Sequence, residues 1–485
     1  MAWALPPATN PTPEAGLVRA LIIIVYLAAV AVAGLWHVRA SRRPDDYFVA
    51  GRRGAFWQVF GSLGATIVGA SATLGVCGMA ATSGFGASAW LWGGALGLIA
   101  AGWAARRLRQ AETVYTVPEY LGIQFGPLVR RLSGLLIVTG WIGVIAAQLL
   151  AIGWIVGPVA DCPAPLAMTV SAFLLGAYVT AGGQKSVLRT DLLQLGALTI
   201  GITMLGVAAW RSLAAGESAA LLQMRWTDFI ADLPSRGGDY LSLALVTCIL
   251  FATGPDIFSR FLCARTAMTF RRAAVACGTL LIPFSLWISA IGVIGATVLP
   301  VTRGDALLPT LTVAVLPEWG QGLVLAGLLA AVISSADTCL LTASSILVME
   351  VSPESAHPDR DAFRRRMRVA VPLVLLVALV AALIYPSIIG ALLTGYQIYA
   401  AAVSPLLLLA VAGQGTRIGN RMAAGLSLAG ALVGFGAVLT GFSWLLAVWF
   451  GCVGGGVLGA WVMDWQKKRA VPKERLHADD SSYLT

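Results

Sequence analysis

The sequence alternates between long apolar stretches and short polar connections, and this alternation limits the folds that are open to it. A helix that crosses the hydrocarbon core of a bilayer needs roughly 20 apolar residues. About thirteen stretches meet this requirement, near residues 17–38, 55–79, 84–104, 133–159, 164–182, 190–210, 240–260, 273–299, 319–349, 369–385, 388–412, 422–441 and 443–463. With 58% hydrophobic and 12% charged residues, the chain is predicted to be an all-α polytopic membrane protein with about thirteen transmembrane helices.

The distribution of Lys and Arg predicts how these helices are oriented. If the N-terminus is outside and the connections alternate sides, 28 of the 33 basic residues fall in inside connections and five fall outside. Basic residues are enriched in cytoplasmic connections of membrane proteins. We therefore expect an external N-terminus and a cytoplasmic C-terminus, in a bacterial inner membrane. The net charge of +10 then reflects topology and does not indicate a nucleic-acid partner.

Two apolar stretches are interrupted near their middle, and they lie five stretches apart. The stretch 55–79 contains five glycines, and the stretch 240–260 contains Thr253-Gly254-Pro255-Asp256. An odd offset gives two five-helix units, 55–210 and 240–412, that run in opposite directions through the membrane. A broken first helix in each inverted unit predicts a transport site at mid-membrane. The alternative interpretation is close helix packing through glycine.

The remaining segments are placed around this 5+5 inverted-repeat core. Residues 1–16 are expected to be a disordered external N-terminus, and 17–54 an extra first helix with a basic cytoplasmic loop. Residues 422–463 supply two C-terminal helices, and 464–485 form a cytoplasmic tail. The lipid bilayer is the environment of the folded chain, which is expected to function as a monomer.

One apolar stretch carries a stripe of hydroxyl groups and an acid. On a helix, Ser334, Ser335, Asp337, Thr338, Thr342 and Ser345 fall within an arc of about 160°. A carboxylate at mid-membrane is costly and usually has a partner or a function. Such a stripe suits a bare monovalent cation. The alternative is a structural carboxylate among packing hydroxyls.

Two further acids lie in apolar stretches. Asp191 either faces this region or caps the N-terminus of its own helix. Asp256 and Arg260 are four residues apart, a spacing at which side chains on one helix can pair.

Several function classes have no support in the sequence. The seven cysteines are scattered, and the three histidines lie near or in basic connections. There is no phosphate-binding loop and no paired acids or nucleophile–base pair, so neither an enzyme nor an ATP-driven pump is expected. No cofactor is expected other than coupling ions.

Five short motifs give the chain a resemblance to the sodium/solute symporter family, whose fold is the LeuT-type inverted repeat. They cover nearly the whole chain in the family's order. They are the segments 46–53 (DYFVAGRR), 117–121 (VPEYL), Gly182-Gly183 followed by Thr190-Asp191, 259–265 (SRFLCAR) and 334–338 (SSADT).

The resemblance implies site residues. One sodium would bind backbone carbonyls of Ala65, Val68 and Ala331 and hydroxyls of Ser334 and Ser335. A second sodium, present in some members, would map to Asp191, Ser334, Asp337 and Thr338. The substrate would lie near Gly69, Ala70, Ser71, Ala72, Thr253, Asp256 and Gln397. Ile67 and Ala72 are apolar or small where sugar and proline carriers of the family have polar groups, so their substrate contacts do not transfer.

The predicted function is a sodium-coupled secondary active symporter that imports a small organic solute by alternating access. Two alternatives remain at this stage. One is proton coupling through Asp337 or Asp191, because a carboxylate without water around it takes up a proton more readily. The other is a transporter-like membrane sensor. Two acids in separate helices further predict two coupled sodium ions.

Overall fold

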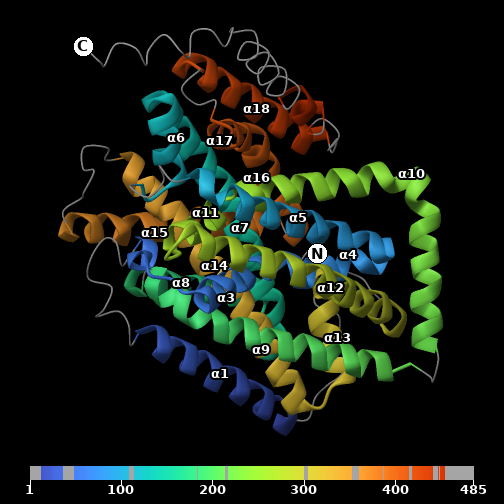
Figure 1. Cartoon of the computed structure of the whole chain (residues 1–485). Helices are drawn as coiled ribbons and strands as arrows, with labels where there is room; N and C mark the ends of the chain where they lie inside the picture. Colours follow the sequence, from blue (N-terminus) through green and yellow to red (C-terminus); the bar gives the residue numbers. More distant parts are fainter. Residues whose placement is uncertain are drawn as a thin grey trace, which may run out of the picture.

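The chain forms one bundle of helices (Figure 1). In this computed structural model the described residues are 13–35, 48–108, 114–182, 184–213, 217–299, 304–351, 360–385, 387–413, 418–440, 446 and 448–453. Within these ranges the regular structure is helical, apart from one isolated β-bridge.

The helices follow the apolar stretches of the sequence. In the first half they are α1 (Pro13–Leu35), η2 (Ala50–Arg52), α3 (Phe56–Ile67), η3 (Ser71–Gly75), α4 (Val76–Ser83), η4 (Gly84–Ser88), α5 (Ala89–Ala104), α6 (Val117–Phe125), α7 (Pro127–Val159), α8 (Ala164–Gly182) and α9 (Gln184–Arg211). In the second half they are α10 (Glu217–Thr253), α11 (Pro255–Cys263), α12 (Ala267–Val298), η6 (Gly304–Ala306), α13 (Leu307–Val315), α14 (Glu318–Val351), α15 (Arg360–Ile384), α16 (Ile388–Ala402), α17 (Ser404–Val411) and α18 (Asn420–Thr440).

Helices are present at each of the first twelve predicted stretches, and most of 443–463 lies outside the described residues. Among the described residues, eight helices are long and apolar enough to span a membrane. The pair α16 and α17, bent by 44° at its break, raises that number to nine. The chain is therefore an integral membrane protein, and the total of thirteen spans stays a prediction.

Two boundaries differ from expectation. Helix α1 begins at Pro13, so the last four residues of the predicted disordered segment 1–16 are helical, while 1–12 lie outside the described residues. Helix α10 begins at Glu217, well before the predicted start at 240, and it turns a corner in Figure 1. Pro234 lies inside it, and proline removes a helical hydrogen bond and kinks a helix.

Both predicted helix breaks are present. Helix α3 ends at Ile67, Val68 has the non-helical angles φ −86° and ψ 51°, and the chain continues through the π-helix η3. In the second unit α10 stops at Thr253 and α11 starts at Pro255, with Gly254 at φ −53° and ψ 138° between them. A helix that breaks inside protein frees backbone carbonyls to bind other groups.

Helix α14 runs through the middle of the bundle (Figure 1), and 89% of its apolar window is buried. It contacts α9, α7, α1 and α3. The hydroxyl stripe therefore faces protein on several sides, which is where polar groups in a membrane helix are expected.

A backbone bridge joins the first helices of the two units. The Gly54 N–H donates to the Cys263 carbonyl at 2.8 Å, and the Arg265 N–H donates to the Gly54 carbonyl at 3.0 Å. The start of α3 is thereby fixed to the end of α11. A Cβ at residue 54 would lie 2.8 Å from the Cys263 oxygen, so this close approach requires glycine.

Candidate cation sites on helix α14

The break in α3 lies directly against Ser335 of α14. Because Gly69 has no side chain, the Ser335 hydroxyl can approach the backbone there: a Cβ at residue 69 would be 2.2 Å from Ser335 Oγ. The helical hydrogen bonding does not resume at once, since the Ala70 N–H bonds to Gln148 Oε1 on α7 at 3.1 Å. The carbonyls at the end of α3 are thus open to side chains.

Four oxygens meet at this point. Ser335 Oγ lies 3.2 Å from the Ala65 carbonyl, 2.8 Å from the Thr66 carbonyl and 3.1 Å from the Ala331 carbonyl. Ser335 is only 2% exposed. One hydroxyl has a single proton and cannot donate fully to three carbonyls. A small cation can bind several such oxygens at once. We call Ser335 and these three carbonyls the neutral corner.

The neutral corner contains part of the predicted first sodium site. Ala65, Ala331 and Ser335 come together as predicted, and Val68 is at the break itself. Thr66, which the prediction omitted, contributes a carbonyl. Ser334 turns elsewhere: its hydroxyl donates to Asp191 Oδ1 at 2.6 Å.

A second cluster lies beside the neutral corner and is charged. Asp191 on α9 is fully buried and accepts a hydrogen bond from Ser62 Oγ at 2.5 Å in addition to the one from Ser334. Arg260 on α11, also fully buried, has its Nη2 3.9 Å from Asp191 Oδ2. An opposite charge and hydrogen bonds are what a buried carboxylate requires.

Arg260 occupies the middle of this cluster. Its Nε donates to Ser62 Oγ at 3.0 Å, and its Nη1 donates to Ser259 Oγ at 3.1 Å. Its Nη2 donates to two hydroxyls, Thr66 Oγ1 at 2.7 Å and Thr338 Oγ1 at 2.5 Å. Thr338 in turn donates to Asp337 Oδ1 at 3.3 Å. All four residues of the predicted second sodium site, Asp191, Ser334, Asp337 and Thr338, are therefore in one network with a guanidinium.

Two interpretations of the acids change. Asp191 does not cap a helix, because it lies about two turns inside α9 and pairs with Arg260. The close ion pair of Arg260 is with Asp191 on another helix, and Asp256 on its own helix interacts with it only as a more distant opposite charge. We call Asp191, Arg260 and the hydroxyls bonded to them the charged cluster.

The predicted substrate residues lie on elements that touch one another. Gly69 to Ala72 belong to the break and η3, and Gln397 lies on α16, which contacts both η3 and α10. Thr253 ends α10, where its hydroxyl lies 2.8 Å from Ser404 Oγ and its carbonyl accepts from Tyr399. Asp256 lies in the first turn of α11.

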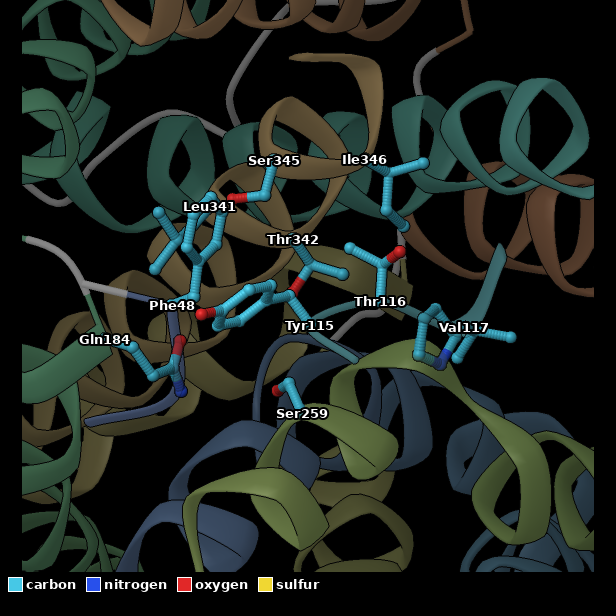
Figure 2. Close-up of a pocket in the computed structure, with 11 residues that line it drawn as sticks. Phe48, Tyr115, Thr116, Val117, Gln184, Ser259, Leu341, Thr342, Ser345 and Ile346 are labelled. Carbon is cyan, nitrogen blue, oxygen red and sulfur yellow. The ribbon is translucent and has the colours of Figure 1, made fainter. Parts of the chain in front are cut away.

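A cavity follows the hydroxyl stripe past Asp337, toward the C-terminal end of α14. Figure 2 shows Thr342 and Ser345 of α14 facing Tyr115, Gln184 and Ser259 around it. Its volume is about 20 Å³, which is small. Since Ser259 also binds Arg260, this cavity begins directly beside the charged cluster. The stripe in the sequence included Thr342 and Ser345, but it gave no sign that they line a cavity.

The sequence is similar to those of known membrane transporters. The family model described as "Sodium:solute symporter family" matches residues 47–434. Sodium/glucose cotransporter 1 of Oryctolagus cuniculus is 23% identical over 380 residues, covering 68% of this chain and 57% of the rabbit protein, so the chain spans little more than half of that relative. The sodium/glucose cotransporter of Vibrio parahaemolyticus is 24% identical over 429 residues, covering 80% and 78%.

The fold also matches a solved structure. A Na+-coupled sialic acid symporter, in a substrate-bound outward-open state, superposes with a TM-score of 0.69 at 18% identity, covering 86% of this chain and 97% of that one. At this identity the likeness establishes the shared fold. It agrees with the breaks in α3 and at α10–α11.

Proposed function

We infer that this chain, which belongs to the sodium:solute symporter family, is a sodium-coupled secondary active symporter that imports a small organic solute by alternating access. The proposal rests first on the neutral corner. Three carbonyls and one hydroxyl converge there between a broken helix and the central helix, and freed carbonyls with hydroxyls are the oxygens by which such transporters hold sodium.

Sodium at the neutral corner would couple ion binding to conformation. Its ligands come from α3 and from α14, which lie in opposite repeats. An ion that binds both helices stabilises the arrangement in which they are adjacent. Loss of the ion then favours their separation, which is the movement that alternating access needs.

We propose that a second sodium uses Asp191, Ser334, Asp337 and Thr338 only when Arg260 leaves them. In the charged cluster the guanidinium already bonds to Thr338 and pairs with Asp191. A sodium ion at this position would need the same Asp191 and Thr338 oxygens that the guanidinium occupies. Arg260 and the second sodium therefore compete.

The solute is proposed to bind between η3, the end of α10 and α16, near Gly69, Ala70, Ser71, Ala72, Thr253, Asp256 and Gln397. The proposal is supported by the contacts of α16 with η3 and α10 and by the rule that broken helices mark the transport site. We expect the N-terminus outside, the C-terminus in the cytoplasm, a bacterial inner membrane and a functional monomer.

Purified protein in sealed vesicles tests the proposal. Radiolabelled sugars, amino acids, carboxylates and vitamins are offered with an inward sodium gradient or with choline replacing sodium at fixed pH. We expect uptake of at least one solute only with sodium. Uptake that follows a proton gradient and ignores sodium would contradict sodium coupling.

Sodium binding is measured separately, without any solute. The melting temperature in detergent should rise with NaCl and not with choline chloride, because a ligand that binds only the folded state stabilises it. An equal response to both salts would argue against the neutral corner as a sodium site.

A further inference from the structure

An apolar cavity lies at the α10–α11 break, on a different side from the cation sites. Its volume is about 150 Å³. Its lining is almost wholly hydrocarbon, and the residues are Ala100, Ala101, Ala104, Leu108, Ala252, Thr253, Gly254, Ile257, Phe258, Phe261, Phe270, Leu407, Leu408 and Val411. A sugar or an amino acid would lose its hydrogen bonds to water there without replacement.

The cavity is reached from the side of the bundle. Ala100 of α5 and Leu408 of α17 are both on its lining and exposed, Leu408 by 43%. Phe258, Phe270 and Leu407 are buried and form its deeper part. Ala100 and Leu408 belong to the predicted membrane stretches 84–104 and 388–412, so an opening at this place would face the acyl chains of the bilayer.

Two arginines are direct sequence neighbours of residues that line this cavity. Arg107 directly follows Arg106 and precedes the lining residue Leu108, and Arg271 directly follows the lining residue Phe270. The Arg271 guanidinium lies 3.5 Å from the centre of the Trp103 ring. Trp103 is 61% exposed, as expected for an aromatic anchor at a membrane surface.

The charge of the lining segments is strongly one-sided. Residues 100–108, 252–272 and 404–411, which supply the whole lining, contain six arginines and one acid, Asp256. Arg260 is used by the charged cluster. The other five arginines are exposed or half-buried on the segments that line the cavity. Arginine pairs with phosphate oxygens through two parallel hydrogen bonds.

We propose that this cavity binds an anionic phospholipid of the inner leaflet, with one acyl chain between α5 and α17 and the phosphate at Arg107 and Arg271. Basic pockets between transmembrane helices at the cytoplasmic side are suited to such headgroups. The proposal requires a membrane-embedded chain, and it depends neither on sodium coupling nor on the identity of the solute.

The bound acyl chain would reach the helix break between α10 and α11 in the second unit. Thr253 and Gly254, the last residues before α11, lie on the cavity wall. The Thr253 carbonyl is held by the Tyr399 hydroxyl of α16. An acyl chain in contact with this break stabilises one arrangement of α10 and α11, so the lipid acts as a regulator of the movement.

Photo-crosslinking in nanodiscs tests the proposal. The full chain is placed in nanodiscs that contain a trace of phosphatidylglycerol or phosphatidylcholine, each with the same diazirine-labelled acyl chain. We expect phosphatidylglycerol to label peptides from 100–108 and 404–411 in preference to phosphatidylcholine. Equal labelling by the two lipids would overturn the headgroup assignment, and label confined to other helices would overturn the site.

Variants separate the two parts of the site. Arg107→Gln and Arg271→Gln should each lower the preference for phosphatidylglycerol about fivefold, the contribution of one basic residue near an anionic surface. Arg272→Gln, an exposed arginine in the next position, is the matched control and should change it less.

Ala104→Phe fills the cavity and should abolish labelling of both peptides. Ala104→Ser, which keeps the space open, should retain it. Circular dichroism and the gel-filtration profile establish that each variant is folded. Labelling that survives in a folded Ala104→Phe protein would exclude the cavity as the place of the acyl chain.

Discussion

The neutral corner and the charged cluster lie next to each other on α14, but one contains only uncharged oxygens and the other contains a buried ion pair. The neutral corner offers carbonyls and one hydroxyl around Ser335, with no acid bonded to it. The charged cluster has a carboxylate that a guanidinium of the same chain already compensates. An ion can leave neutral oxygens without exposing a buried charge, whereas Asp191 needs a positive partner at all times. The neutral corner is thus suited to binding and releasing a cation. The charged cluster is suited to holding a permanent positive partner, Arg260, which only another cation can replace.

Arg260→Met should have the largest effect. It removes the buried partner of Asp191, and breaking a buried pair costs about 3–5 kcal/mol. We expect a large drop in melting temperature that high NaCl partly restores and choline chloride does not, because sodium can then occupy the cluster.

Arg265→Met is the control for Arg260→Met, since Arg265 is an exposed arginine just after α11. It should melt close to the wild type. If sodium failed to stabilise Arg260→Met more than the wild type, Arg260 and sodium would not share a position.

Gly69→Ala should disrupt the neutral corner. The new Cβ would lie 2.2 Å from Ser335 Oγ, so α3 and α14 must separate, at a cost of about 1–3 kcal/mol. Sodium-dependent uptake should be lost while the protein remains folded. At Gly196 of α9 nothing lies within 4 Å of an added Cβ, and Gly196→Ala should transport normally; full activity in both variants would refute the close contact.

Ser335→Ala tests the neutral corner by removing one oxygen. We expect the sodium concentration for half-maximal uptake to rise about tenfold or more, the scale of one contact to a charge. Expression and folding should be preserved, because little volume changes. An unchanged sodium dependence would remove Ser335 from the site.

Ser334→Ala is the neighbouring change and should have the smallest effect. It removes only the hydroxyl that bonds to the Asp191 carboxylate, worth about 1.5–3 kcal/mol of stability, and none of the oxygens of the neutral corner. Half-maximal sodium should stay within about twofold of the wild type, while the Hill coefficient for sodium falls towards one as the second position weakens. A tenfold loss of sodium affinity would show that Ser334 is a ligand of the first sodium site, together with Ser335.

The fold could be predicted because each apolar stretch is a local signal. The breaks at Gly69 and at Gly254-Pro255 were visible for the same reason, since glycine and proline change the backbone where they stand. The N-terminal extension of α10 was not predicted because residues 217–239 lack the apolar character that identifies a membrane helix.

The cation sites could be predicted only in part, since they depend on how separate helices meet. Ser334 and Ser335 are neighbours in sequence, but successive residues point about 100° apart on a helix, so one faces Asp191 and the other faces α3. Spacing suggested Asp256 as the partner of Arg260. The actual partner is Asp191 on α9, and no local pattern connects residues so far apart in the chain.

The bridge at Gly54 has a mechanical consequence. Two backbone hydrogen bonds join the start of α3 to the C-terminal end of α11. The first helices of both inverted units are therefore fixed to each other at this one point. A rigid rotation of either helix about this point carries the other with it. The breaks at Val68 and Gly254 lie at the opposite ends of α3 and α11 from the bridge, and we therefore expect the greatest opening there.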